Sequence, residues 1–425
     1  MTIAFAAMLL GTVIAWLATL RPSITRITPP NDSSFSMAQV RHGSELAALG
    51  SCAVCHTSDG GVTFAGGRGL ATPFGTIFTS NITPDPATGI GAWSSEAFRR
   101  AMREGVSRDG HHLYPALPYE HFTHTSDADL DALYAYFMTR GAIRSTPPAN
   151  RLIPPLGFRP LLAGWKLLFL HGGPHERDPR HSDEWNRGAY LVDTLGHCGG
   201  CHTPRNFAGG EEGGRPFAGG FAEGWQAPAL DASNPQAATW TADSLMHYLR
   251  GGVERNHGVA AGPMGPVAHE LTTVPESDVR AIAVFIESTM HPNRVPVAAP
   301  SSAASAIDRV ADASASEPIG ATIFAGACAG CHEPTAPMAG EGRPLLSSTS
   351  TVLSPSPDNA LQAVLSGVRS PDDGQTPYMP AFRESLTDEQ AAAVVAYVRS
   401  RFSDRPAWKS AKAVSARLRK EGAQP

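Results

Sequence analysis

The chain has 425 residues, of which 42% are hydrophobic, and a formal net charge of −5 at pH 7. This length allows two to four domains, each with enough apolar side chains for a core. The charge is mildly acidic and shows no basic stripe of the kind that follows a phosphate backbone, so nucleic acid is excluded as an expected partner.

The chain begins with an apolar run, from Thr2 to Leu20, that carries no charged residue. Its length suits a helix that crosses a bilayer. A signal peptide usually has a basic start and a small-residue cleavage site, whereas here no Lys or Arg precedes the run and Leu20-Arg21-Pro22 follows it. We therefore predict a retained membrane anchor over residues 1–21, with a cleaved signal peptide as the alternative. The stretch from Ser23 to Phe35, rich in Pro, Ser and Thr, is predicted to be a spacer.

Two cysteines three positions apart, followed at once by a histidine, occur three times and use all six cysteines of the chain. The copies are Cys52, Cys55 and His56; Cys198, Cys201 and His202; and Cys328, Cys331 and His332. This is the attachment signature of c-type haem, in which both thiols add to haem vinyl groups and the histidine becomes the proximal iron ligand. A zinc site needs four ligands, and a redox disulfide does not explain a histidine after every pair.

The three motifs therefore predict three covalently bound haems c. Their first cysteines are 146 and 130 residues apart, which favours one domain for each haem. Covalent haem attachment is associated with the outer side of a bacterial inner membrane, so we expect a periplasmic location.

Each motif lies in a repeated unit. A glycine precedes the first cysteine by 9, 10 and 8 residues in turn (Gly43, Gly188 and Gly320), and the intervening residues suit a short helix that the motif ends. A later helix in each unit has the amphipathic i, i+3, i+4, i+7 spacing and is interpreted as a core helix. These helices contain Leu130, Leu133, Tyr134 and Phe137; Val279, Ile282, Ala283 and Ile286; and Ala391, Val394, Val395 and Val398. Ser126 and Thr387 are predicted to cap two of them.

A middle helix in the first two units is predicted to begin after the N-caps Ser94 and Thr241. These helices run into glycine-valine pairs that begin at Gly105 and Gly252, and the third unit has Gly367-Val368. The residues twelve positions after these glycines are Leu117, Met264 and Met379.

A methionine on a proline-flanked loop opposite a haem is the usual second axial ligand of a c-type cytochrome, and its thioether raises the reduction potential. Filling core space is the commoner use of methionine. Because two of the three units place methionine at the same offset, we expect Met264 and Met379 to ligate iron.

The first unit departs from this rule, because Leu117 has no donor atom. Met102, three residues before Gly105, is our leading candidate for the missing ligand. The alternative is that Met102 belongs to the core, as its counterpart Leu249 does. His111 and His112 are the main competitors, and an open iron position is the remaining possibility.

These signals predict an all-α protein with three tandem cytochrome c domains behind an N-terminal membrane helix. The predicted segments are an anchor at 1–21, domain 1 at 36–145, a connector at 146–183, domain 2 at 184–292, a flexible linker at 293–316, domain 3 at 317–403 and a basic tail at 404–425. The linker predicts independent motion of domain 3. For the apolar run from Leu161 to Leu170, packing within this chain is preferred over docking on a partner or contact with lipid. The tail is interpreted as a solvated helix end, with anionic lipid or an acidic partner as alternatives.

Several short stretches carry a resemblance to a known family. They are residues 52–57 around the first motif, Thr-Pro-Phe-Gly-Thr-Ile at 72–77, Asn-Ile-Thr-Pro-Asp at 81–85, His-His-Leu-Tyr-Pro-Ala at 111–116 and Cys-His-Thr-Pro-Arg-Asn at 201–206. In these the chain resembles the three-haem cytochrome c subunits that accompany bacterial membrane-associated dehydrogenases, over nearly everything after the anchor. The resemblance implies an electron-transfer subunit, not an enzyme, that passes electrons from a dehydrogenase catalytic subunit to quinone or another cytochrome at the periplasmic side of the inner membrane.

We consider two branches of this family for this chain. One serves quinoprotein alcohol dehydrogenases or flavin-dependent sugar and gluconate dehydrogenases, and has methionine where this chain has Leu117. The other is similar to the cytochrome subunits of molybdenum hydroxylases that oxidise aldehydes or N-heterocycles such as nicotinate, and often lacks that methionine. Residues 159–166 and 184–191 extend the match to the second branch, which we favour. A haem peroxidase, with one open iron position, is a less favoured alternative from another class.

Overall fold

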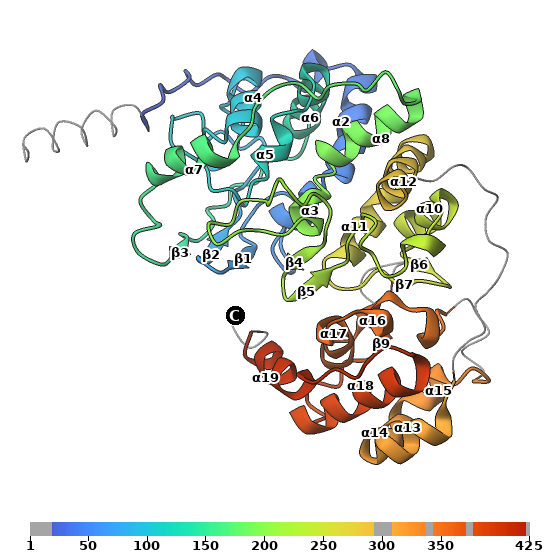
Figure 1. The fold of residues 1–425 in the computed structure, drawn as a ribbon. Coiled ribbons are helices and arrows are strands. Elements are labelled where there is room, and N and C mark those ends of the chain that lie inside the picture. Colours follow the sequence, from blue (N-terminus) through green and yellow to red (C-terminus); the bar gives the residue numbers. More distant parts are fainter. Residues whose placement is uncertain (1–18, 293–307, 337–342, 371–376, 422–425) are drawn as a thin grey trace, which may run out of the picture. The chain divides into compact units, whose positions relative to one another are not determined.

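The computed structural model of the protein describes residues 19–292, 308–336, 343–370 and 377–421 (Figure 1). The chain divides into two compact units. Unit 1 comprises the residues up to His181 together with Tyr190–Gly200, and unit 2 comprises Ser182–Ala189 together with the residues from Cys201 onward. Unit 1 therefore holds the first haem motif and unit 2 the third, and the division passes through the second motif.

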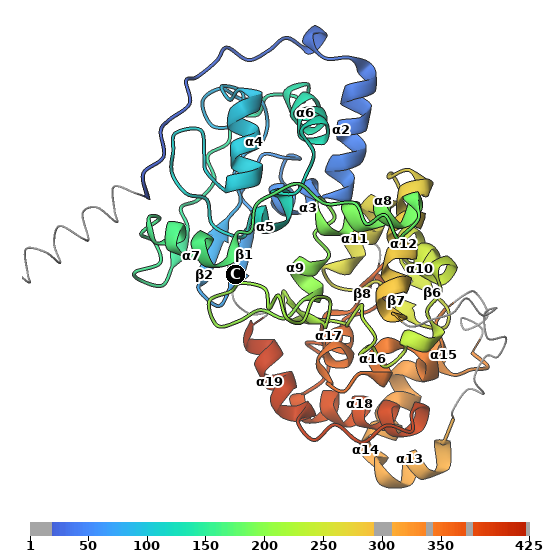
Figure 2. The ribbon, with the colours of Figure 1, turned by 45° about the horizontal axis from the view of Figure 1, so that its top comes forward.

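The elements are mainly helices, as predicted, and the sheets between them are short and antiparallel. Up to residue 181 the described elements are η1 (Asp32–Ser34), α2 (Met37–Leu49), α3 (Cys52–His56), β1 (Gly69–Thr72), β2 (Gly75–Phe78), α4 (Ser95–Glu104), α5 (Tyr119–Phe122), α6 (Asp127–Met138), β3 (Arg151–Leu152) and α7 (Leu161–Phe169). Strands β1, β2 and β3 form one sheet in that order. Helices α2 and α6 lie side by side (Figures 1 and 2).

The chain then passes through α8 (Asp183–Asp193) and α9 (Gly199–His202) into the rest of unit 2. The elements up to residue 292 are β4 (Gly220–Ala222), β5 (Trp225–Ala227), η2 (Ala237–Thr239), α10 (Ala242–Gly251), β6 (Val253–Glu254), β7 (Gly258–Val259), α11 (Met264–Leu271) and α12 (Glu276–Met290). Those from residue 308 onward are α13 (Val310–Ser316), α14 (Pro318–Ile323), the π-helical turn η3 (Phe324–Cys328), α15 (Ala329–His332), η5 (Leu346–Ser348), α16 (Ser350–Leu353), α17 (Asp358–Ser366), β8 (Val368–Arg369), β9 (Pro377–Met379), α18 (Asp388–Phe402) and α19 (Ala411–Glu421).

The repeated glycines allow the first and last helices of each predicted domain to cross at close range. A Cβ atom on Gly43 of α2 would lie 2.0 Å from the carbonyl oxygen of Ala132 in α6. The same construction gives 1.9 Å between Gly188 and Ala281 O, and 2.1 Å between Gly320 and Ala393 O. Any side chain at these positions would force the helices apart, so the repeat in the sequence reports a repeated helix crossing.

The predicted capping and core residues are confirmed. Ser94 Oγ accepts a hydrogen bond from Ala97 N at 3.2 Å, and Thr241 caps α10 in the same way. Ser126 caps α6, and Thr387 forms a capping box at the start of α18. The amphipathic faces of α6, α12 and α18 are largely buried, which confirms them as core helices.

The third predicted domain is bonded to the second within unit 2. Ser350 Oγ donates to Gln236 Oε1 at 2.5 Å, and Gln236 Nε2 donates to Ser348 O at 2.8 Å. A second contact joins Asn359 Nδ2 to Gln226 O at 2.8 Å. The independent motion that we predicted for the third domain conflicts with these bonds. Of the predicted flexible linker, residues 310–316 form α13, and residues 293–307 lie outside the described residues.

The predicted basic tail contains a packed helix rather than a solvated end. Helix α19 contacts α17 and α18, and Leu418 is buried. Arg417 pairs with Asp358, and Arg419 Nε donates to Asp388 Oδ1 at 2.7 Å. Two of the tail's arginines therefore attach α19 to the third domain.

The predicted anchor at residues 1–21 falls almost wholly outside the described residues. Within the described ranges, no helix combines the length and the apolar character that crossing a membrane requires. The predicted spacer that follows is bonded along unit 1: Ile24 N donates to Arg108 O at 2.8 Å, and Ile27 N donates to Ala92 O at 3.1 Å. Figure 2 shows this segment running past α4 on its way to α2.

Candidate haem-binding sites

The first motif occupies α3, which follows α2 after a tight turn. Ser51, between the two helices, has a left-handed backbone (φ 47°). Within α3 the thiols of Cys52 and Cys55 are separated by about one helical turn, the spacing that two adjacent vinyl groups require. His56 ends the helix, and its Nδ1 lies 2.7 Å from the carbonyl oxygen of Ser80.

That contact fixes the tautomer of His56. A carbonyl oxygen only accepts, so Nδ1 carries the proton and donates, which leaves the lone pair of Nε2 for a metal. A histidine that ligates a metal usually holds its other ring nitrogen in this way. Burial lowers the pKa of His56 below its ordinary value, which favours the neutral imidazole that binds iron.

The second motif repeats this arrangement. His202, at the end of α9, has Nδ1 2.7 Å from the carbonyl oxygen of Pro228, and burial lowers its pKa as well. Sequence reasoning missed both carbonyl partners, Ser80 and Pro228. They lie 24 and 26 residues after their histidines, a similar interval that would have been the only signal.

The third motif ends α15. Burial lowers the pKa of His332 and raises the pKa of the Cys328 thiol to about 11. None of the six motif cysteines is in a disulfide, so all are available for thioether bonds. Among the described residues, no three His, Cys, Asp or Glu side chains gather as a metal site. The thiol pairs and the histidines fit haem c.

In the first two predicted domains the backbone repeats in the register on which the second ligands were predicted. Gly105 and Gly252 end α4 and α10 with left-handed backbones (φ 58° and 65°). In each case the residue eight positions later donates its N–H to the glycine carbonyl, at 2.7 Å for Leu113 and 2.6 Å for Ala260. Leu117 and Met264 therefore stand at the same offset from equivalent backbone hydrogen bonds.

Met264 is half-buried at the start of α11. Met379 is also half-buried, and it pairs with Val368 in the β8–β9 ladder. The residues between these strands, 371–376, lie outside the described residues. Iron ligation by both methionines stays a prediction.

Met102 is buried, at 7% exposure, on the same face of α4 as Phe98. Helix α4 packs against α5, which begins two residues after Leu117, so Met102 and the loop of the missing ligand belong to neighbouring elements. Burial suits both a core residue and an iron ligand. Ligation by Met102 stays a prediction.

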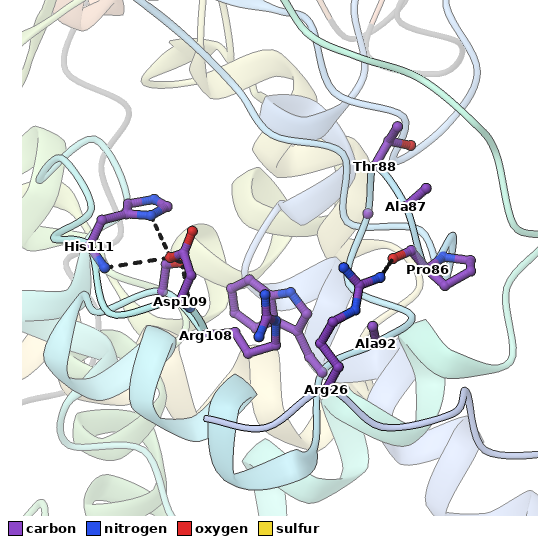
Figure 3. A pocket seen from close by; sticks show the side chains of 11 residues that line it. Arg26, Pro86, Ala87, Thr88, Ala92, Arg108, Asp109 and His111 are labelled. Atoms are coloured by element: carbon purple, nitrogen blue, oxygen red, sulfur yellow. Dashed lines mark hydrogen bonds and ion pairs between the residues drawn. The ribbon is translucent and has the colours of Figure 1, made fainter. Parts of the chain in front are cut away.

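The competing histidines have other partners. His112 Nε2 donates to Thr19 O at 2.8 Å, and His112 Nδ1 lies 3.0 Å from the ammonium of Lys166. Both nitrogens of His112 are thus engaged, which weighs against ligation. His111 Nδ1 contacts the carboxylate of Asp109 at 2.5 Å in a surface pocket (Figure 3). In the same pocket Arg26 donates to Pro86 O at 2.5 Å, so the pocket lies where the N-terminal segment packs against the rest of unit 1.

Helical domains that carry haem attachment motifs, with histidines held for iron, define the class of the protein as a c-type cytochrome. The sequence model of a family described as cytochrome c oxidase, cbb3-type, subunit III matches residues 315–398. The fructose dehydrogenase cytochrome subunit of Gluconobacter japonicus is 34% identical over 91% of this chain and 84% of its own length. The gluconate 2-dehydrogenase cytochrome c subunit of Pantoea cypripedii is 35% identical over 87% of this chain and 86% of its own.

A nicotinate dehydrogenase subunit of Pseudomonas putida is 48% identical over 97% of this chain, but this chain spans only 34% of that protein. The chain belongs to the family of cytochrome c subunits of dehydrogenases, which confirms the resemblance seen in its motifs. It is an electron-transfer component rather than a catalytic subunit, so the peroxidase alternative is set aside.

Proposed function

We propose that this chain binds three haems c, one at each motif, and passes electrons from a dehydrogenase catalytic subunit to quinone or another cytochrome. The observation that carries the proposal is the threefold motif, two copies of which hold the proximal histidine through a carbonyl bond of 2.7 Å. Bound haem c supplies one-electron oxidation and reduction of its iron. The rest of the function is positioning and tuning, which falls to this chain.

Different residues of the chain position the haems and tune their potentials. The three cysteine pairs hold the cofactor covalently, and the Nδ1–H bonds of His56 and His202 fix the tautomer and raise the basicity of the ligating nitrogen. Met264 and Met379 are the proposed second ligands, whose thioethers raise the reduction potential. In the first domain Met102 takes this role, because Leu117 has no donor atom.

For the partner we propose a molybdenum-hydroxylase type of dehydrogenase that oxidises an N-heterocycle such as nicotinate, or an aldehyde. The 48% identity to the nicotinate dehydrogenase subunit of Pseudomonas putida supports this branch, as does Leu117 in place of methionine. A quinoprotein alcohol dehydrogenase or a flavoprotein sugar or gluconate dehydrogenase is the second candidate. It is favoured by one observation: the fructose and gluconate dehydrogenase cytochrome subunits match this chain over 84% and 86% of their own length.

The proposed location is the periplasmic side of the bacterial inner membrane, with residues 1–21 as the anchor. The apolar, uncharged sequence of Thr2 to Leu20 supports an anchor of this kind. Three haem attachment motifs support the periplasm, because covalent attachment is associated with that compartment.

The test is to purify the chain together with its partner from native membranes, identify the partner by mass spectrometry, and follow the haem absorption after adding substrates. We expect nicotinate or an aldehyde to reduce the haems of the complex, and neither to reduce the chain once it is separated from its partner. Reduction by alcohols, sugars or gluconate instead would select the second candidate. Oxidation of any of these substrates by the separated chain would contradict the relay.

A further inference from the structure

Helix α7 buries its charged residue and exposes leucines to solvent. In an ordinary surface helix the apolar stripe faces the core and the charged residues face water. In α7 the single charged residue, Lys166, is 8% exposed, whereas Leu167 is 87% exposed and Leu168 is 67% exposed. Leu161, two helical turns before Leu168, is 47% exposed. These three leucines form the apolar face of α7, and our prediction that the run packs within the chain is wrong for them.

The inward side of α7 is held by specific contacts. Lys166 Nζ donates to the carbonyl oxygens of Glu104 and Gly105, both at 2.6 Å, at the end of α4. A cation at a helix C-terminus complements the carbonyls that have no partner within that helix. Trp165 packs edge-on against Tyr119 at 5.9 Å between ring centroids. These contacts fix which face of α7 points outward.

The segment of chain that contains α7 carries charge of one sign. From residue 132 to residue 175 the chain contains no Asp or Glu and five Arg or Lys. Two further apolar side chains of the same segment are exposed, Ile153 at 57% and Phe158 at 54%. Apolar side chains among basic ones are typical of a segment that lies on an anionic lipid surface.

The apolar N-terminal run ends beside α7. The carbonyl of Thr19 accepts from His112 Nε2, and His112 Nδ1 contacts Lys166 of α7. Thr19 and Leu20 line a small cavity together with Arg159 and Pro160, the two residues that precede α7. Thr19 and Leu20, at the end of the apolar run, therefore lie beside the N-terminal end of this helix, and the bonded segment after them holds them in place.

We infer that the apolar face of α7 lies in the boundary between the headgroups and acyl chains of the bilayer, so that unit 1 rests on the membrane beside its anchor. This inference rests on the proposal that residues 1–21 are anchored in the membrane, and it adds a second contact that fixes the orientation of unit 1. An ordinary water-exposed helix gains nothing from adjacent outward leucines, whereas an interfacial helix buries them in lipid.

The test places a nitroxide spin label at Leu167→Cys in the full chain. The native cysteines carry haem, so the label attaches to the new thiol only. Met37→Cys is the matched control, because Met37 is 90% exposed and belongs to the same unit. With vesicles of phosphatidylglycerol and phosphatidylethanolamine, we expect collisions with oxygen, relative to a water-soluble nickel chelate, to increase several-fold at position 167 and to stay unchanged at position 37.

Each other outcome overturns the inference in a recognisable way. If the chain binds vesicles but both labels stay accessible to the nickel chelate, the anchor stands and the role of α7 is wrong. If the chain does not bind vesicles, membrane attachment and the inference fall together, while substrate-driven haem reduction remains a separate measurement. Shielding of position 167 by the dehydrogenase partner in the absence of lipid would identify a protein interface instead.

A second variant checks the same point without a label. Leu167→Glu combined with Leu168→Glu changes two exposed side chains, so the fold and the haem spectrum should be retained. We expect vesicle binding of this variant to weaken several-fold. Unchanged binding would overturn the role of α7.

Discussion

The first and second haem-binding regions share one scaffold and differ on one side of it. Val106 pairs with His112 as Val253 pairs with Val259, at the same spacing after the glycines that end α4 and α10. Both proximal histidines are held by a carbonyl at 2.7 Å. The two regions differ at the position of the second axial ligand, where the first has Leu117 and the second has Met264. The fold thus fixes the proximal side through its backbone and leaves the other axial position to a side chain that sequence change can alter.

The largest expected effect comes from the close helix crossing at a glycine, which both regions share. Gly43→Ala and Gly188→Ala each place a Cβ atom within 2.0 Å of a helix carbonyl. We expect each to destabilise its domain by about 3 kcal/mol, the upper end for overpacking, and to reduce haem incorporation. Thermal unfolding and haem content measure this. Gly141→Ala is the control, because no atom lies within 4 Å of the new Cβ. Tolerance of alanine in only one region would break the comparison.

The next largest expected effect concerns the second axial ligand, the position at which the two regions differ. Met264→Leu removes the proposed thioether ligand, so one sulfur-to-iron charge-transfer band should disappear. The potential of one haem should fall by on the order of 0.1 V, since axial ligands set potentials over about 0.8 V. Redox titration with absorption spectroscopy measures both. Met290→Leu, a buried methionine of the same unit, should change neither. Loss of the band in Met290→Leu instead would overturn the assignment.

A third measurement tests whether Met102 of α4 supplies the methionine ligand that the first region lacks at Leu117. Met102→Leu should remove one further charge-transfer band if α4 supplies the ligand, as we propose. Met138→Leu, buried at 3% exposure in the same unit, is the control. An unchanged set of methionine-ligated haems in Met102→Leu would sink the assignment and leave an open iron position.

The smallest effect is a pH dependence that His112 gives the first region, and Val259 occupies the equivalent position in the second region. Burial, with Lys166, Arg21 and His111 nearby, lowers the pKa of His112 below its ordinary 6.5. Between this lowered pKa and about pH 6.5 the unfolded chain binds more protons than the folded chain, so stability is lost as the pH falls below about 6.5. Each unit of lowering of the histidine pKa costs about 1.4 kcal/mol in acid.

The thermal midpoint of unit 1, measured between about pH 7 and about pH 5, should therefore fall on acidification. His112→Gln keeps one donor and one acceptor but does not titrate, so its midpoint should fall less. An equal fall in both proteins would assign the pH dependence to other groups.

Much of this architecture follows from local patterns. The caps at Ser94 and Thr241, the core helices and the glycine crossings each depend on a few residues close in sequence or on an exact repeat. The carbonyl partners Ser80 and Pro228 depend on the path of long loops, which no local pattern encodes.

The failures have a common physical origin in contacts between distant segments. An apolar run normally buries its leucines, but α7 turns Lys166 inward because the end of α4 offers it two carbonyl acceptors. The basic tail was expected in water, yet Asp358 and Asp388 supply partners for its arginines. Composition indicates how a segment behaves in isolation. In both of these segments the charged side chains bind partners that are distant in the sequence.

The most direct test of the central claim is the intact mass of the denatured mature chain. We predict the polypeptide mass plus three haems, with peptides that locate one haem at each cysteine pair, because all six thiols form thioether bonds. Fewer than three haem adducts, or a motif recovered with free thiols, would contradict the account.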